Sequence, residues 1–284
     1  MTLRVECEHA LLGMMHAADA WGRRWSENQN IVARRYMELA VRKQSLVVLA
    51  ADCSTMSGMR DLLEQVADSS IVLKTHVDLI EDWSIASWME IAQRARDLDM
   101  LIFEDRKFAD IARISQLQMT GIHGISEWAD LVTAHMISGP DMVEGLAAAW
   151  NSARRDGGVL LLAQMSSRGN LLDEDYSRAV VATGSLFRRE VAGYIGNGSD
   201  PEDVGRLRVL VGESQLIWTP GIHIDADEGE RGQRYGGPRE SVLAGSDALI
   251  VGSGIHSSGS PADAARQYAA AGWDGLMQRM GGVD

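Results

Sequence analysis

Residues 46–55 read Leu46-Val47-Val48-Leu49-Ala50-Ala51-Asp52-Cys53-Ser54-Thr55, an apolar run that ends in a polar turn. A run that is apolar at every position predicts a strand buried on both faces, as in a parallel sheet. The turn contains no glycine, whereas a doubly wound sheet usually carries a glycine-rich turn after its first strand. This stretch therefore favours a parallel barrel over an open doubly wound sheet.

Apolar or β-branched runs of the same kind recur along the chain at a regular interval. They predict eight strands, at residues 46–50, 71–75, 100–104, 130–135, 159–163, 191–195, 215–219 and 248–252. Between them, apolar residues at three- and four-residue spacing predict helices at 56–67, 83–96 and 141–154. Eight strand-then-helix units over about 240 residues are typical of a TIM (β/α)8 barrel.

The first 44 residues precede the first predicted strand and are rich in Arg, Trp and Met. They read as one or two helices that cap the bottom of the barrel or pack on its side. We therefore expect an N-terminal helical extension at residues 1–44 and a (β/α)8 barrel domain at residues 45–284.

The chain is acidic, with 27 Lys+Arg against 40 Asp+Glu in 284 residues and a net charge of −13. This balance argues against nucleic-acid and anionic-membrane partners, because both require clustered Lys and Arg. The apolar runs are far shorter than a membrane span, and Glu6 and Glu8 are unlike the basic start of a signal peptide. Two cysteines, Cys7 and Cys53, cannot form a disulfide framework. We expect a cytoplasmic protein.

Charged residues of alternating sign follow the first three predicted strands. Asp52 follows the first, Lys74 ends the second, and Asp105, Lys107 and Asp110 follow the third. Functional groups of a TIM barrel lie at the C-terminal ends of its strands, so we expect these five side chains to converge on one face. A run of charged residues usually lies on a solvated surface. This run, however, directly follows an apolar strand, and lysines stand at or just after the ends of two successive predicted strands. The pattern indicates a catalytic site with lysine as acid and aspartate as electrostatic partner.

Residues 103–111, Phe-Glu-Asp-Arg-Lys-Phe-Ala-Asp-Ile, resemble the Asp-x-Lys-x-x-Asp signature of the orotidine 5'-phosphate decarboxylase family in its eukaryote-like wording. Further motifs of that family are matched in order at residues 73–78, 127–130, 134–135, 165–167, 219–221, 232–235 and 270–273. The resemblance covers roughly residues 45 to 275 and leaves the N-terminal segment uncovered. Together these motifs are highly specific.

The resemblance implies a decarboxylation of a pyrimidine 6-carboxylate, orotidine 5'-phosphate to uridine 5'-phosphate, with neither cofactor nor metal. Lys107 resembles the lysine that stabilises the ring carbanion and then protonates it. Asp105 resembles the aspartate placed close to the substrate carboxylate. Asp110 resembles the aspartate that the neighbouring subunit of a homodimer supplies.

The same resemblance implies a set of substrate contacts. Asp52 and Lys74 resemble the pair that binds sugar hydroxyls and holds the charge network in register, and Ser166 resembles the serine that hydrogen-bonds the pyrimidine. Gln233 and Tyr235 resemble phosphate-loop contacts. The remaining expected contacts to a pyrimidine nucleotide or nucleoside are Ile111, Gly252, Ser253 and Gly254.

Two positions depart from the family pattern. Ser253 stands where the family has an arginine that grips the substrate phosphate, and Ile114 stands where it usually has a threonine that reaches the partner subunit's ribose. Arg234 or Arg168 could replace the missing guanidinium, and backbone N–H groups at residues 252–254 could hold a phosphate. An alternative is a paralogue that decarboxylates an unphosphorylated or sugar-modified orotidine-like nucleoside in specialised nucleoside biosynthesis.

Three other classes of protein compete with these interpretations. A metal-dependent barrel hydrolase would want a His-x-His after the first strand, and the sequence has none there. A related barrel branch keeps the Asp-x-Lys-x-x-Asp motif and uses magnesium on sugar phosphates, but residues 165–167 and 233–235 point away from it. Outside catalysis, the alternative is a pyrimidine nucleotide-binding protein, against which the intact Lys107 and its flanking aspartates speak.

Overall fold

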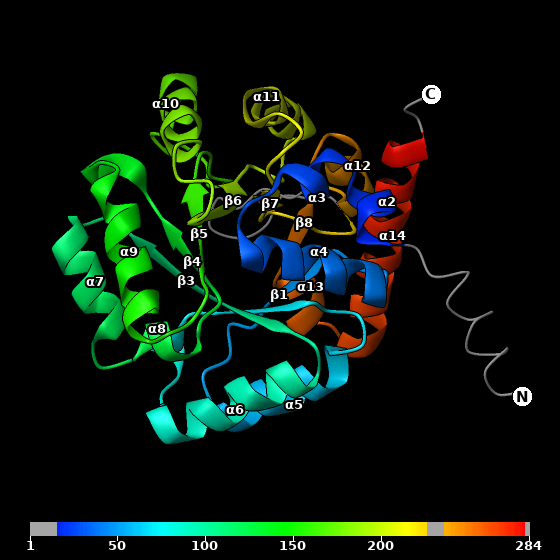
Figure 1. Ribbon diagram of the computed structural model, residues 1–284. Helices are drawn as coiled ribbons and strands as arrows, with labels where there is room; N and C mark the ends of the chain where they lie inside the picture. The colour runs from blue at the N-terminus through cyan, green and yellow to red at the C-terminus, as the bar shows by residue number, and fades with distance from the viewer. Residues whose placement is uncertain (1–15, 226–235, 282–284) are drawn as a thin grey trace, which may run out of the picture.

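Eight parallel strands form a closed barrel in chain order in the computed structural model, which describes residues 16–225 and 236–281 (Figure 1). The strands are β1 (Val47–Ala50), β2 (Val72–Thr75), β3 (Leu101–Phe108), β4 (Leu131–Ala134), β5 (Gly158–Leu162), β6 (Val191–Ile195), β7 (Ile217–Thr219) and β8 (Ala248–Val251). Pairing of β1 with β8 closes the barrel. The predicted TIM barrel is confirmed.

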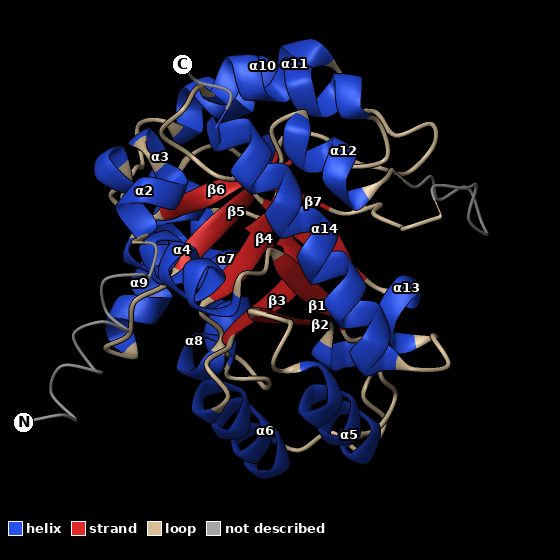
Figure 2. Ribbon diagram, turned by 90° about the vertical axis from the view of Figure 1, so that its right-hand side faces the viewer, coloured by secondary structure: helices blue, strands red, loops and turns tan. Residues whose placement is uncertain are grey.

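Helices form a layer around the strands (Figure 2). After β1 they are α5 (Met56–Val66), α6 (Ile85–Asp97), α7 (Ala112–Thr120), α8 (Ile125–Trp128), α9 (Asp141–Ser152), α10 (Glu174–Gly184), α11 (Pro201–Val211), α12 (Pro238–Leu243), α13 (Ser253–His256) and α14 (Pro261–Gly281), with two 3-10 turns, η1 (Val77–Leu79) and η2 (Met136–Ser138). The Thr55 and Ser84 hydroxyls accept backbone N–H bonds at the starts of α5 and α6, which explains where these two helices begin. Among the described residues, no helix has both the length and the apolar character needed to cross a membrane.

The interior of the barrel is filled by large side chains below its open end. Trp218 of β7 is fully buried, and its ring lies 4.5 Å from the ring of Tyr36 and 6.4 Å from that of Phe103, centroid to centroid. Phe103 also lines the cavity above. These packed rings thus form a solid floor below the polar groups of the cavity.

In the described part of the chain, helices α2 (Ala17–Trp21), α3 (Arg23–Glu27) and α4 (Ile31–Lys43) precede β1 and cover the N-terminal end of the barrel. The Tyr36 hydroxyl donates to the Asp247 carbonyl at 2.8 Å, and the Asn30 amide donates to the carbonyls of Gly157 and Arg189 at 3.1 and 2.7 Å. These carbonyls lie just before β8, β5 and β6. The helices therefore close the end of the barrel opposite to the strands' C-terminal ends.

A buried carboxylate ties this closed end together. Asp247 is completely buried and pairs with Arg24 Nε at 2.9 Å, with Arg279 Nη2 at 2.7 Å and with Arg208. Burial alone would raise the pKa of Asp247, but the three guanidinium groups outweigh it and lower that pKa to about 2. The cluster joins α3, α11 and α14 to the start of β8.

Candidate active site

Strand β3 carries the charge cluster inside the strand. It continues to Phe108, whereas the sequence predicts an end at residue 104. The predicted end is wrong because the charged side chains of residues 105–107 are paired with side chains of neighbouring elements, so the strand continues through them. Alternation along the strand points Phe103 and Asp105 into the cavity and Glu104 away from it.

A bulge sets the direction of Lys107. Pairing of β3 with β4 shifts register between Glu104 and Phe108, and Lys107 has a φ of 52°, in the left-handed region. This conformation is unfavourable for a residue with a Cβ. Bulges and strained residues of this kind gather at active sites, where they re-aim a side chain. Here the distortion delivers the ammonium of Lys107 to the cavity.

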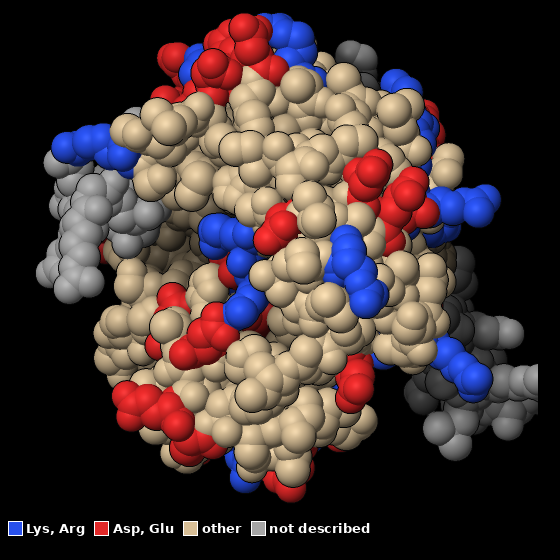
Figure 3. All heavy atoms as spheres, turned by 90° about the vertical axis from the view of Figure 1, so that its left-hand side faces the viewer, with Lys and Arg blue, Asp and Glu red and all other residues tan. Residues whose placement is uncertain are grey.

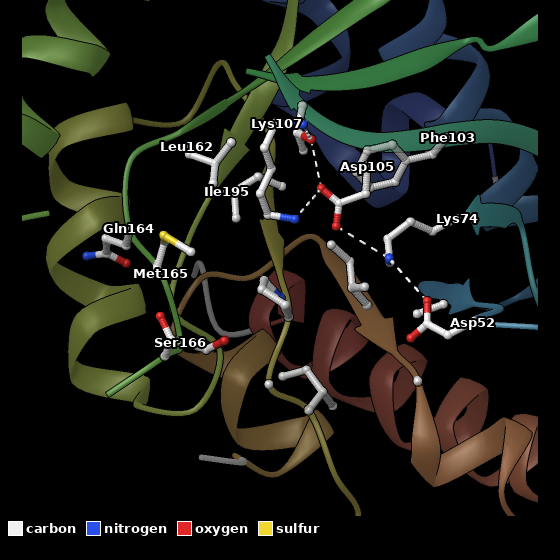
Figure 4. Close-up of a pocket in the computed structure, with 18 of the residues that line it drawn as sticks. Asp52, Lys74, Phe103, Asp105, Lys107, Leu162, Gln164, Met165, Ser166 and Ile195 are labelled. Carbon is white, nitrogen blue, oxygen red and sulfur yellow. Dashed lines mark hydrogen bonds and ion pairs between the residues drawn. The ribbon is translucent and has the colours of Figure 1, made fainter. Parts of the chain in front are cut away.

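Four charged side chains form a continuous chain of ion pairs at the mouth of the barrel (Figure 4). Lys107 Nζ lies 2.8 Å from Asp105 Oδ1, Lys74 Nζ lies 3.4 Å from Asp105 Oδ2, and the same Nζ lies 3.8 Å from Asp52 Oδ1. The Lys74 side chain is only 6% exposed, while that of Lys107 is 36% exposed. Of the two lysines in these ion pairs, Lys107 is therefore the one that a ligand reaches more easily.

Asp105 is held as an anion at the centre of the chain. Burial works to raise the pKa of its carboxyl, but the attraction of Lys74 and Lys107 outweighs burial and holds that pKa well below its usual range. The Thr133 hydroxyl donates to Asp105 Oδ1 at 2.7 Å and accepts the backbone N–H of Lys107 at 2.9 Å. One threonine thus fixes both the carboxylate and the strained residue beside it.

His76 adds a neutral imidazole to the array. Its Nε2 lies 3.0 Å from Lys74 Nζ and 3.5 Å from Asp105 Oδ2. Burial and the Lys74 ammonium lower the pKa of His76. Because an ammonium can only donate, Nε2 accepts from Lys74 and the ring proton of the neutral imidazole is assigned to Nδ1.

A cavity of about 460 Å³ opens at the C-terminal ends of the strands, a volume within the usual range of small-molecule sites. The charged array lines one side, and the side chains of Phe103, Leu162 and Ile195 are apolar walls. Ser166, which is 8% exposed, faces the cavity after β5. Charged groups next to apolar walls suit a ligand that has both polar and apolar surface.

At the β8 end of the cavity, the residues that the sequence predicts as substrate contacts carry no charge. Gly252 and Ser253 line it, and so does His256, which no sequence motif singles out. Gly254 instead packs against Tyr268, whose hydroxyl oxygen would clash with a Cβ added to Gly254. Gln233, Arg234 and Tyr235 lie outside the described residues.

Asp110 stands apart from the other four predicted charges. Its carboxylate accepts the N–H of Ile111 at 2.7 Å, and both residues are exposed and absent from the cavity wall. Within the described part of the chain, no ion pair joins Asp110 to the array. Asp110 therefore does not join the array of its own chain, because β3 ends before it and the chain turns outward into α7.

Thr133 belongs to the site but is not among the site residues expected from the sequence. The sequence does contain a signal for it. It is the polar residue at an inward position of the otherwise apolar strand β4. His256 offers no comparable signal, since it follows a short glycine-flanked turn. Over residues 16–225 and 236–281, no group of three or more His, Cys, Asp and Glu side chains is arranged to hold a metal ion.

Comparisons with known proteins agree on one family. The model of the Orotidine 5'-phosphate decarboxylase / HUMPS family matches residues 45–268. Orotidine 5'-phosphate decarboxylase of Coccidioides posadasii is 34% identical over 261 residues, covering 90% of this chain and 94% of the relative. Uridine 5'-monophosphate synthase of Caenorhabditis elegans is 32% identical over 259 residues, which cover 90% of this chain and 50% of that protein.

A solved structure supports the fold. The crystal structure of orotidine 5'-phosphate decarboxylase from Pyrococcus horikoshii OT3 matches with a TM-score of 0.63 and 24% identity, over 80% of this chain and 98% of that chain. Because the family model extends over the whole barrel and the fungal relative is similar along nearly all of its own length, the assignment is direct. The chain belongs to the Orotidine 5'-phosphate decarboxylase / HUMPS family.

Proposed function

We propose that this protein decarboxylates orotidine 5'-phosphate to uridine 5'-phosphate. The observation that carries the proposal is the chain of ion pairs from Asp52 through Lys74 and Asp105 to Lys107, set in a ligand-sized cavity of a family member. Two lysines and two aspartates sum to no net charge. A substrate carboxylate therefore meets a balanced array whose individual charges are fixed in place.

Lys107 is the proton donor in this proposal. The bond between the ring carbon and the carboxylate breaks, carbon dioxide leaves, and the electron pair stays on the ring carbon. That carbon then takes a proton from the Lys107 ammonium, which regains one from solvent. Because an ammonium has three N–H groups and Asp105 accepts one of them at 2.8 Å, two remain to face the ring. The cation stabilises the negative charge as it moves onto the ring carbon.

Asp105 acts on the ground state. Its carboxylate is ionised and held by Lys74, Lys107 and Thr133, so it cannot turn away when a second carboxylate binds beside it. Repulsion between the two carboxylates is relieved as carbon dioxide leaves. The positive charges of Lys74 and Lys107 offset part of this repulsion, so that the substrate can still bind.

Loss of orotate absorbance during turnover of orotidine 5'-phosphate tests the proposal. Lys107→Ala should abolish turnover, and unchanged turnover in this variant would show that the assignment is wrong. A chelator should leave the rate unchanged. A chelator-sensitive activity on a sugar phosphate would instead favour the magnesium-using branch, and tight nucleotide binding without turnover would favour a binding protein.

We also propose a homodimer in which Asp110 completes the neighbour's site. Apolar side chains are exposed near it, with Ile111 59%, Leu117 45% and Ile137 74% exposed. Most of the surface on the side where α7 lies is uncharged (Figure 3). Exposed apolar surface of this kind marks interaction sites, and a second copy would bring Asp110 with it.

Complementation tests this arrangement. Asp110→Asn and Lys107→Ala should each be inactive alone, whereas co-expression should restore about a quarter of wild-type activity, because half of the dimers are mixed and one of their two sites is intact. Sedimentation of the wild type should give a dimer. No restored activity would show that Asp110 acts within its own chain or not at all.

A second candidate substrate is the unphosphorylated or sugar-modified nucleoside. The observation that favours it is Ser253, which lines the cavity at the position where the family pattern has the phosphate-binding arginine. Comparison of kcat/KM for orotidine and for its 5'-phosphate separates the candidates. Efficient and strongly preferred use of the phosphate would refute the nucleoside.

A further inference from the structure

Two pairs of side chains lie back to back where β2 meets β3. Thr75 and Glu104 are direct partners in the strand register. Lys74 and Asp105, the neighbouring residues on each strand, face the cavity and pair with each other. Because side chains alternate along a strand, Thr75 and Glu104 point to the other face, between barrel and helices, where both are buried.

Glu104 makes its hydrogen bonds on both sides of His76. Its Oε2 accepts from the Thr75 hydroxyl at 2.8 Å, and its two carboxylate oxygens lie 3.4 and 3.3 Å from the backbone N of Val77, whose N–H they accept. His76, between these two residues, reaches round to Lys74 and Asp105 on the cavity face. The carboxylate thus holds the stretch of chain that positions the imidazole.

This arrangement is unfavourable for stability. Glu104 is 1% exposed, and no Lys, Arg or His in the described chain lies within ion-pair distance of it. Burial raises the pKa of Glu104 to about 7 despite its hydrogen bonds from Thr75 and Val77. A buried carboxylate without a counter-ion is destabilising, and such local violations concentrate at functional sites.

We propose that Glu104 is a positioning residue of the active site, whose carboxylate fixes the end of β2 so that His76 and Lys74 stay against Asp105. The proposal rests on the proposed decarboxylation, because the array that it positions is the reacting one. Glu104 itself does not line the cavity and acts only through residues 75–77.

The protonation state of Glu104 should matter for this role. A carboxylate accepts from both donors, whereas a protonated carboxyl keeps one acceptor oxygen for the Val77 N–H and donates its own proton, for which the Thr75 hydroxyl must turn from donor to acceptor. Arg106 of β3 lowers the pKa of Glu104 and Asp78 of η1 raises it, while Asp78 also contacts His123 Nε2 at 3.1 Å. His76, whose pKa is lowered by burial and by Lys74, also lies beside this network. The hold on residues 75–77 should weaken as pH falls through about 7.

Glu104→Gln keeps the size of the side chain and removes one acceptor oxygen. With orotidine 5'-phosphate between about pH 5.5 and 8.5, we expect kcat to fall about 10-fold with KM changed less than about twofold, and the inflection near pH 7 to disappear from the kcat profile. The His76 imidazole, followed by NMR, should titrate closer to the ordinary histidine value than it does in the wild type.

Asp130→Asn is the matched control. Asp130 is also buried, and its carboxylate accepts the N–H of Ile102 at 2.8 Å, at the opposite end of β3. We expect it to lose stability but to keep the wild-type kcat and pH profile. Wild-type kinetics in Glu104→Gln, or the same kinetic change in Asp130→Asn, would overturn the positioning role. If the wild type does not turn over the substrate, the proposed function fails, while the His76 titration still decides the role of Glu104.

Discussion

Thr133→Val should separate catalysis from folding at this site, because Thr133 fixes two groups at once. Its hydroxyl donates to Asp105 at 2.7 Å and accepts the N–H of Lys107 at 2.9 Å, and the residue is 1% exposed. Valine has nearly the same shape and neither hydrogen bond. The perturbation is therefore confined to the hydroxyl.

The size of the expected effect follows from the two groups that lose their hydrogen bond to the Thr133 hydroxyl. A buried N–H without a partner costs about 1–3 kcal/mol, and a hydrogen bond to an ionised group contributes about 1.5–3 kcal/mol. Lys107 also occupies a left-handed backbone conformation that is unfavourable by about 1–2 kcal/mol, which it can relieve by relaxing once Thr133 releases its N–H. That relaxation moves the Lys107 ammonium. We expect kcat to fall about 10- to 100-fold, equivalent to about 1.4–2.8 kcal/mol, with the free energy of unfolding lower by about 2 kcal/mol.

Steady-state decarboxylation and urea denaturation measure the two effects separately. Thr133→Ser keeps the hydroxyl and should stay within a few-fold of the wild-type kcat. A Thr133→Val variant with wild-type kcat would refute the link between the bulge and catalysis. Equal loss in Thr133→Ser would show that the methyl group, and not the hydroxyl, holds the array.

Three further expectations concern other parts of the fold. Asp247→Asn should lower the free energy of unfolding by about 3–5 kcal/mol in urea denaturation, because three buried guanidinium groups lose their anion, with kcat unchanged; a loss below about 1 kcal/mol would contradict this. Since the pKa of Asp247 is lowered to about 2, the ionised carboxylate contributes its full stabilisation above about pH 4, and the free energy of unfolding should fall by about 2 kcal/mol as pH drops to 2. Asp247→Asn should lack this part of the acid sensitivity. An equal loss of stability in acid in the wild type and in Asp247→Asn would contradict the lowered pKa. Gly254→Ala should push aside the hydroxyl of Tyr268, which accepts the N–H of Ile224 at 2.9 Å beside the cavity, and raise KM several-fold; a wild-type KM would refute that.

Much of the fold could be predicted because parallel strands buried on both faces leave uninterrupted apolar runs. The end of β3 could not, because residues 105–107 are charged and read as loop, while in the barrel their ion pairs compensate for burial. Local hydrophobicity carries no information about a partner on the neighbouring strand. The same limit hides the position of Asp110, which depends on where the chain turns after the strand.

The site could be predicted as a set of residue types but not as a geometry. Lys74 and Asp105 follow from their places at strand ends. The left-handed backbone of Lys107 follows from the register shift against β4, which no spacing of residues reveals. Thr133 was accessible in principle, since one polar residue in an inward position of an apolar strand needs an explanation.

The cluster around Asp247 also constrains how the chain is made. Arg24 leaves the ribosome early, whereas its partners Asp247 and Arg279 are made much later. Segments fold in the order of synthesis only where their contacts allow it, and these contacts join opposite ends of the barrel sequence. The contact between α3 and the start of β8, and the Asp247 cluster that also includes α14, therefore cannot form until the last strand and the last helix have been made.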